Sequence, residues 1–263
     1  MKPLHLYLLS TLLSFLASIL IGLPGCDSAA RQEARNRAYV SGELARQIKA
    51  VRDGTSDTIE LADGQVYDEH LAKLAELGNL RSLLLHNTKV TDAGLAHLEG
   101  LDTLRSLKLV NSNITDAGLD HLSGMTEMEV LDIDGRGITD AGLAKLTGLK
   151  NLVLVNLWQT QLTDAGLSSF QEFPKLKQLR FGSEHVTDAG MPALAAIAPL
   201  TRLHLMNMPI TDEGLKAFEG KQNLQSFYVD NTNVTEQGLA RLAESIPGLH
   251  IHVNDAHLEE ANH

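Results

Sequence analysis

The pentapeptide Thr-Asp-Ala-Gly-Leu, or a close variant of it, recurs seven times along this 263-residue chain with a constant step of 24 residues. The seven copies begin at Thr91, Thr115, Thr139, Thr163, Thr187, Thr211 and Thr235. A repeat of about 20 to 29 residues cannot enclose a core of its own, so each unit buries its apolar side against its neighbours. The period therefore predicts a solenoid of stacked coils.

Two columns of apolar residues recur at the same period. The first contains Ile59, Leu83, Leu107, Leu131, Val155, Leu179, Leu203, Phe227 and Ile251, and the second contains Leu61, Leu85, Leu109, Ile133, Leu157, Phe181, Leu205, Val229 and Val253. One variable residue separates the two columns, and side chains alternate between the faces of a strand, so each unit is predicted to contain a short strand with one face inward. The columns predict nine strands stacked in parallel.

The Thr-Asp pair predicts the start of a short helix after each strand. The threonine hydroxyl can accept a backbone N–H of the first turn, and the aspartate lies beside the positive end of the helix dipole. A glycine inside that turn costs about 1 kcal/mol relative to alanine, so its recurrence predicts close contact between neighbouring coils. Glycines at the helix ends are expected to be left-handed, namely Gly100, Gly124, Gly148 and Gly220.

The segments outside the repeats have their own patterns. Residues 38–55 are predicted to form an amphipathic helix that caps the first repeat, because apolar residues recur there at helical spacing, at Val40, Leu44, Ile48 and Val51. Residues 27–37 are small and polar and are expected to form a flexible linker. The repeats are expected to occupy residues 56–258, and residues 259–263 to form a tail.

Residues 1–26 have the order of a secretory leader, in which Lys2 precedes an uncharged apolar stretch that ends at Cys26, the sole cysteine. The last four leader residues, Leu23, Pro24, Gly25 and Cys26, resemble the lipobox of bacterial lipoproteins, which implies that Cys26 is acylated after cleavage. An uncleaved signal anchor is the alternative, because the apolar run is about the ~20 residues needed to cross a bilayer. In both cases we expect a membrane-anchored domain of the bacterial cell envelope, facing the periplasm or the exterior.

The net charge argues against anionic partners, and the cysteine content excludes stabilisation by a disulfide within the chain. The formal net charge is −11, and a nucleic acid or an anionic headgroup would require a basic stripe that the sequence lacks. A single cysteine cannot form an intramolecular disulfide, so packing alone must stabilise an exported domain. We expect no nucleic-acid partner and a monomeric chain.

The pattern formed by Leu80, Leu83, Leu85, Thr88 and Val90, followed by the pentapeptide, resembles a leucine-rich repeat. The resemblance covers residues 56–258 and is similar to the cysteine-containing subclass. It implies an α/β solenoid, with a right-handed coil, a parallel sheet on the concave face and short helices on the convex face. The family's usual Asn or Cys is replaced here by Arg136, Glu184 and Met208 in the third, fifth and sixth copies, so no regular side-chain ladder is expected there.

The residues between and beside the two inward columns are expected to point to the concave side. These positions do not repeat, so they are free of the packing constraint and form the candidate binding face. Interface energy concentrates on tryptophan, tyrosine and arginine, which makes Trp158, Arg180 and Tyr228 the expected anchors. The full candidate set is Lys108, Asp132, Asp134, Asn156, Trp158, Arg180, His204, Met206 and Tyr228. Trp158 lying flat over Gly182 is the alternative interpretation of that side chain.

Three chemical alternatives arise on the same face. Asp132 and Asp134 invite comparison with the carboxylate pair of glycoside hydrolases, but a general acid needs burial that an open face is expected to lack, and an exposed ion pair with Lys108 is favoured. His250 and His252 resemble half a metal site with no third ligand beside them. We therefore expect no cofactor, no metal and no enzymatic activity.

These observations favour a membrane-tethered interaction module that holds a protein or peptide on its concave sheet. The alternative is a carbohydrate-binding or wall-associated structural protein of the envelope.

Overall fold

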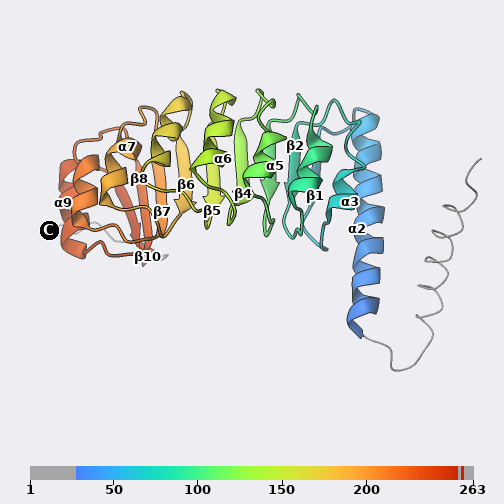
Figure 1. Cartoon of the computed structure of the whole chain (residues 1–263), viewed down its shortest axis with the longest axis horizontal. Coiled ribbons are helices and arrows are strands. Elements are labelled where there is room, and N and C mark those ends of the chain that lie inside the picture. Colours follow the sequence, from blue (N-terminus) through green and yellow to red (C-terminus); the bar gives the residue numbers. More distant parts are fainter. Residues whose placement is uncertain (1–27, 254–255, 258–263) are drawn as a thin grey trace, which may run out of the picture.

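The computed structural model describes residues 28–253 and 256–257. Within them the chain forms one long array, in which helix α2 (Ser28–Arg52) stands at one end and a single sheet runs along the molecule (Figure 1). Cys26, Leu258 and the expected tail at 259–263 lie outside the described residues.

The sheet contains ten strands that pair in the order in which they occur in the sequence. They are β1 (Thr58–Leu61), β2 (Ser82–Leu85), β3 (Ser106–Leu109), β4 (Val130–Asp134), β5 (Leu154–Trp158), β6 (Gln178–Gly182), β7 (Arg202–Met208), β8 (Ser226–Thr232), β9 (His250–Val253) and β10 (Ala256–His257). Strands β1 to β9 are parallel and pair without a register slip, which confirms the predicted stack of nine. The tenth strand was not predicted, and it pairs with β9 in the antiparallel direction.

A short helical segment follows each of the first eight strands and lies along one side of the sheet (Figure 1). These segments are α3 (Asp68–Leu71), α4 (Asp92–Leu95) with η1 (Ala96–Leu98), α5 (Asp116–Asp120), α6 (Asp140–Lys145) with η2 (Leu146–Gly148), η3 (Gly166–Glu172), η4 (Asp188–Gly190) with α7 (Met191–Ala195), α8 (Asp212–Leu215) with η5 (Lys216–Phe218), and α9 (Glu236–Ser245). Several are wholly or partly 3-10, because a 24-residue coil leaves room for only one or two helical turns.

The core lies between the sheet and these helices and is continuous along the described array. The first inward column is buried throughout, and the second is buried except at its last member, Val253, which is half-buried at the end of the array. Neither column could be buried by a single coil, so the burial confirms that neighbouring units supply each other's core.

An aspartate clamp joins each coil to the next. Asp116 shows the geometry: its Oδ1 accepts the backbone N–H of Thr139 at 2.8 Å, and its Oδ2 accepts the Thr139 hydroxyl at 2.6 Å. The same pair of bonds is made by Asp68, Asp92, Asp140, Asp164, Asp188 and Asp212. The sequence predicted only that the aspartate would lie beside the helix dipole. In the structure its main contacts are the two bonds that fix the following coil.

The threonine also caps a helix in five of the clamps, at Thr115, Thr139, Thr187, Thr211 and Thr235. Thr139 Oγ1 accepts the N–H of Ala141 at 3.2 Å while it donates to Asp116, so one hydroxyl serves as helix cap and inter-coil donor. At Asp212 the bonds from Thr235 lower the pKa of the carboxyl group, because they stabilise its charged form.

The recurring glycine makes room for this clamp. A Cβ at Gly142 would overlap Asp116 Oδ1, and the equivalent overlap with the preceding coil's aspartate exists at Gly94, Gly118, Gly166, Gly190, Gly214 and Gly238. The predicted close contact between coils is confirmed at this position. The prediction for the helix ends is only half right, since Gly100 and Gly220 have positive φ whereas Gly124 and Gly148 do not.

The first coil has no preceding aspartate and uses a histidine instead. His70 stands where later coils have glycine, is 1% exposed, and accepts the backbone N–H of Tyr67 on its Nδ1 at 3.0 Å. Its ring thus takes the place of the carboxylate that clamps every later coil. Burial lowers the pKa of His70, so the neutral ring that can accept this bond is favoured.

Helix α2 covers the open end of the array, and the four predicted apolar residues, Val40, Leu44, Ile48 and Val51, are buried. The Gln47 amide completes this cap, because it accepts the N–H of Glu60 at 2.8 Å and donates to the Glu60 carbonyl at 2.7 Å. The exposed backbone of β1 at Glu60 is thereby satisfied.

The expected flexible linker at 27–37 is wrong for the described residues, because α2 already begins at Ser28. The segment contains strong helix formers and no glycine or proline, so its polarity reflects exposure and not disorder. Asn36 also joins it to the first coil by accepting the N–H of Gln65 at 3.0 Å. The helix ends at Arg52, earlier than the predicted 55.

The side-chain ladder is irregular, as expected. Thr88 and Thr160 are buried and donate to carbonyl groups of the next coil, at 3.1 Å and 3.0 Å. Arg136 and Glu184 are exposed, and Met208 is buried as an apolar residue.

Replacement of Gly142 by alanine is expected to lower the free energy of unfolding by about 1–3 kcal/mol, because the new Cβ displaces Asp116 and leaves the half-buried N–H of Thr139 without its acceptor. Urea denaturation of the full chain measures the change. Gly124→Ala is the matched control, since no heavy atom lies within 4 Å of its Cβ, and it should alter stability by less than about 0.5 kcal/mol. Equal effects of both variants would contradict the clamp.

The His70 clamp predicts a pH dependence. The pKa of His70 in the folded protein lies below the ordinary value of 6.5, which applies to the unfolded chain. As the pH falls through 6.5, the unfolded chain therefore takes up the proton first. The stability that His70 contributes is present above pH 6.5 and is lost below it. We expect the wild-type midpoint in urea to fall between pH 7.5 and 5.5 more steeply than that of His70→Asn, whose amide oxygen accepts the same bond without titrating. Parallel pH profiles for the two proteins would rule out this role.

Candidate functional site

The register of the sheet assembles one row of side chains on the side away from the helices. This row contains Leu84, Lys108, Asp132, Asn156, Arg180, His204, Tyr228 and His252, as the sequence predicted, and it begins with Glu60 on β1. We call this side of the sheet, from Lys108 to Tyr228, the sheet face. Its residues come from different coils at adjacent positions, so it can place unlike side chains about 4.8 Å apart.

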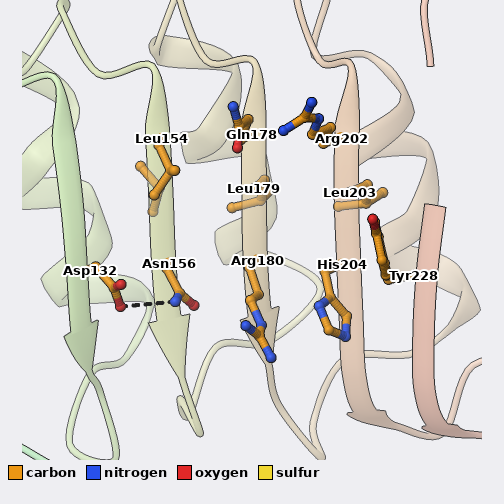
Figure 2. Close-up of a pocket in the computed structure, with 11 residues that line it drawn as sticks. Asp132, Leu154, Asn156, Gln178, Leu179, Arg180, Arg202, Leu203, His204 and Tyr228 are labelled. Atoms are coloured by element: carbon orange, nitrogen blue, oxygen red, sulfur yellow. Dashed lines mark hydrogen bonds between the residues drawn. The ribbon is translucent and has the colours of Figure 1, made fainter. Parts of the chain in front are cut away.

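A polar chain crosses β3, β4 and β5. Lys108 Nζ lies 3.2 Å from Asp132 Oδ2. On the other side, Asn156 Nδ2 donates to Asp132 Oδ1 at 2.9 Å, which is the dashed line in Figure 2. The predicted ion pair is present, but the expectation that it would be exposed is wrong, since Asp132 is only 9% exposed. A short carboxylate on a sheet is covered by the longer side chains of its neighbours.

Asn156 is the least satisfied member of this chain. The residue is 8% exposed, and its Oδ1 has no hydrogen-bond partner within the described part of the protein. Buried polar groups are nearly always hydrogen-bonded, so an unpaired oxygen on a candidate site is a reason to look for a ligand donor.

The two strongest anchor candidates lie against each other. The guanidinium carbon of Arg180 is 3.7 Å from the centre of the Trp158 ring, which is a cation–π contact between adjacent strands. At Gly182 the space that a Cβ would take is occupied by Met206, whose Cγ would lie 2.8 Å from that Cβ. Met206 is 4% exposed, so its predicted place on the accessible surface is wrong.

Tyr228 is held between two histidines. Its ring stacks on His252 with centroids 4.2 Å apart, and the ring of His204 lies 5.3 Å away on the neighbouring strand β7. His204 Nε2 in turn lies 2.6 Å from Asp230 Oδ2. The ring of Tyr228 is therefore fixed in position and flanked on both neighbouring strands.

Asp134 pairs in register with Trp158 and is half-buried. Burial raises the pKa of its carboxyl group, and the negative charge of Asp132 raises it further. A bond from the backbone of Asn111 and the charge of Arg136 act in the opposite direction. The expected lack of burial on this face is therefore wrong for both aspartates, although Asp132 is already engaged by Lys108 and Asn156.

Two hollows open on the sheet face. One of about 290 Å³ lies between Asp132 and Tyr228 and is bordered by Gln178, Arg180, Arg202 and His204 (Figure 2). The other, of about 380 Å³, lies between Lys108 and Trp158. Asp132, Asn156 and Arg180 border both hollows, so the two form one continuous depression across β3 to β8.

Comparison with known proteins agrees with this geometry. The family described as Leucine Rich repeat matches residues 101–123 and 198–218. The structure is similar to that of internalin C2 from Listeria monocytogenes, with a TM-score of 0.56 and 23% identity over 74% of this chain and 80% of the other. The fold is that of a leucine-rich repeat protein.

A second Listeria monocytogenes leucine-rich repeat structure, the internalin inlF, has a TM-score of 0.56 and 24% identity, and the match covers 73% of this chain and 51% of that one. At these identities the likeness concerns the fold. No curated protein sequence matches the chain significantly.

The candidate residues predicted from the sequence omit one row of the sheet, which borders the 290 Å³ hollow. Leu154, Gln178 and Arg202 form a row of their own, two residues before the central row. This row also varies from coil to coil, and that variation was the available signal.

The described residues of the leucine-rich repeat array contain no group of three or more His, Cys, Asp or Glu that could hold a metal ion. Of the predicted half site, His252 stacks on Tyr228, and His250 is exposed at the start of β9.

Proposed function

We propose that this leucine-rich repeat protein is a non-enzymatic interaction module that binds a protein or peptide on its sheet face. The observation that carries the proposal is the contrast between the two sides of one coil. The inward columns and the aspartate clamp repeat every 24 residues, whereas the sheet face changes at every coil and contains a continuous depression.

The rigidity of the sheet supports this function. Strands that are already paired lose little conformational freedom when a partner binds, so a few anchors suffice for specificity. Arg180 over Trp158 and Tyr228 between two histidines are fixed before any ligand arrives. A strip of nine short strands offers roughly 500 Å², less than the ~800 Å² of a standard interface side, so a protein partner would also contact the loops.

The carbohydrate alternative has weaker support. Sugar platforms need a flat aromatic face that a sugar ring can cover. Here Arg180 lies over the ring of Trp158, and the rings of His204 and His252 flank Tyr228. A catalytic role is also disfavoured, because both oxygens of Asp132 already have partners.

We propose further that the module is tethered to a membrane of the bacterial envelope through Cys26. Within the described residues no helix has the length and apolar character needed to span a bilayer. The described chain begins with helix α2 at Ser28, two residues after Cys26 in the sequence, and this helix packs on the first coil.

A photo-crosslinking amino acid at position 158 in intact cells is expected to capture one discrete partner protein. The same amino acid at His97, which is exposed on the helical side, is the matched control and should give no such adduct. Mass spectrometry identifies the captured chain. The proposal fails if position 158 captures nothing above background, or if both positions capture the same proteins.

Acylation of Cys26 predicts that the chain incorporates an alkyne-labelled fatty acid in growing bacteria and that Cys26→Ser abolishes the label. Gel fluorescence after click chemistry measures the incorporation. A labelled wild type and an unlabelled variant would distinguish a lipoprotein from an uncleaved anchor, which would be unlabelled in both forms.

A further inference from the structure

Helix α2 is cationic, although the chain as a whole has a net charge of −11. The helix contains six arginine or lysine residues and two glutamates, so the excess of acidic residues lies in the remainder of the chain. Neutral residues separate these cations in the sequence, which therefore contains no basic run, but the helix brings several of them to one side. The expectation that the chain offers no basic surface to an anionic headgroup is thus wrong for α2.

The cations gather on the side of α2 that faces away from the coils. With 3.6 residues per turn, Arg35, Arg46 and Lys49 lie opposite the four buried apolar residues that pack on the first coil, and all three are exposed. Tyr39 lies on the same side and, at 53%, is the only exposed large hydrophobic residue of the described part of the chain. We call Arg35, Tyr39, Arg46 and Lys49 the outer face of α2.

The carboxylates near the outer face hold its cations only weakly. Glu43 contacts Arg46, and Asp53, just after the helix, contacts Lys49. Both pairs join exposed residues three or four positions apart, and such pairs contribute little in water. Glu33, the other glutamate of the helix, lies on its inner side near the first coil. The cations can therefore exchange these contacts for external phosphate groups.

A hollow of about 600 Å³ lies beside the outer face, between α2 and the helical side of the first coil. Lys49, Arg52 and Lys73 border it. Asp53 and Glu76 border it too, and they pair with Lys49 and Arg52. The apolar side chains that complete its lining are Ala45, Ile48, Ala72 and Ala75. Three cations beside apolar side chains suit a lipid headgroup, whose phosphate accepts hydrogen bonds above an apolar glycerol ester region.

We propose that the outer face of α2 lies on a membrane surface that contains anionic lipids, so that the array stands upright on this helix. Each arginine or lysine near such a surface adds to the attraction, and tyrosine is enriched where a membrane meets water. The inference rests on the proposed location in the envelope and names what α2 contacts there.

The shape of the molecule fits this orientation. Helix α2 lies across one end of the array, and the coils extend away from one side of it (Figure 1). Its 25 residues span about 38 Å, and nine strands ~4.8 Å apart rise to a similar height, so the helix is a broad base. The acidic coils are repelled by the same surface, which leaves the sheet face in solution for a protein partner.

The test uses the full chain with Cys26→Ser and Tyr39→Cys, so that a polarity-sensitive dye attaches at position 39 alone. The protein is mixed with vesicles of phosphatidylcholine, or of phosphatidylcholine and phosphatidylglycerol in equal amounts. We expect the emission to shift to the blue on the anionic vesicles only, and the shift to weaken with added salt. The same dye at Glu244→Cys, exposed on α9 at the far end of the array, is the matched control and should not shift (Figure 1).

Two double variants make the test specific to the outer face. Arg35→Gln with Lys49→Gln removes two of its cations and is expected to lower the ratio of membrane-bound to free α2 about thirtyfold. Lys175→Gln with Lys177→Gln removes the same charge from exposed positions of the coils and should leave that ratio unchanged.

The inference is overturned if the dye at position 39 shifts equally on both kinds of vesicle, if it shifts on neither, or if the two double variants behave alike. A larger shift with soluble polyglutamate than with anionic vesicles would also overturn it, because α2 would then bind an acidic protein. These outcomes are separate from the tether, which the fatty-acid label at Cys26 measures. A labelled Cys26 together with an unshifted dye would retain the lipoprotein and reject the contact of α2 with the membrane.

Discussion

The whole array depends on one repeated contact, in which an aspartate of one coil holds the backbone N–H and the hydroxyl of a threonine in the next. The contact needs a carboxylate, a threonine 23 residues later and a position without a Cβ, and the pentapeptide supplies all three in each coil. Because the carboxylate accepts both bonds, the coils are fixed in direction as well as in spacing. The straight register of nine strands follows from this repeated geometry.

The same contact explains why the sheet face is free to vary. The clamp and the inward columns lie on the helical side and within the core, so they place no demand on residues such as Asn156, Arg180 and His204. The fold therefore tolerates a buried, incompletely satisfied amide on its outer surface, which a minimal structural design would avoid.

Periodicity predicted the backbone of this protein well and its side-chain environment poorly. The columns gave the strands, their register and their order, because every coil repeats the same constraint. Burial of Asp132 and of Met206 could not be read in this way, since it depends on which side chains the two neighbouring strands present. Helix α2 was predicted too short at its start for a different reason: exposed polar residues with high helix propensity resemble a linker when only their hydropathy is considered.

Both described ends of the sheet are covered by groups from outside the repeat. A parallel sheet with bare edges would recruit further strands, and each described edge is occupied by a group that the repeat does not contain. At β1 the Gln47 amide bonds the backbone of Glu60, and His70 replaces the missing aspartate of the first clamp. At the other end β10 pairs with β9 in the antiparallel direction. A further parallel strand therefore cannot pair with the edge of β9 that β10 occupies. Strand addition at either described edge of the sheet is thus discouraged.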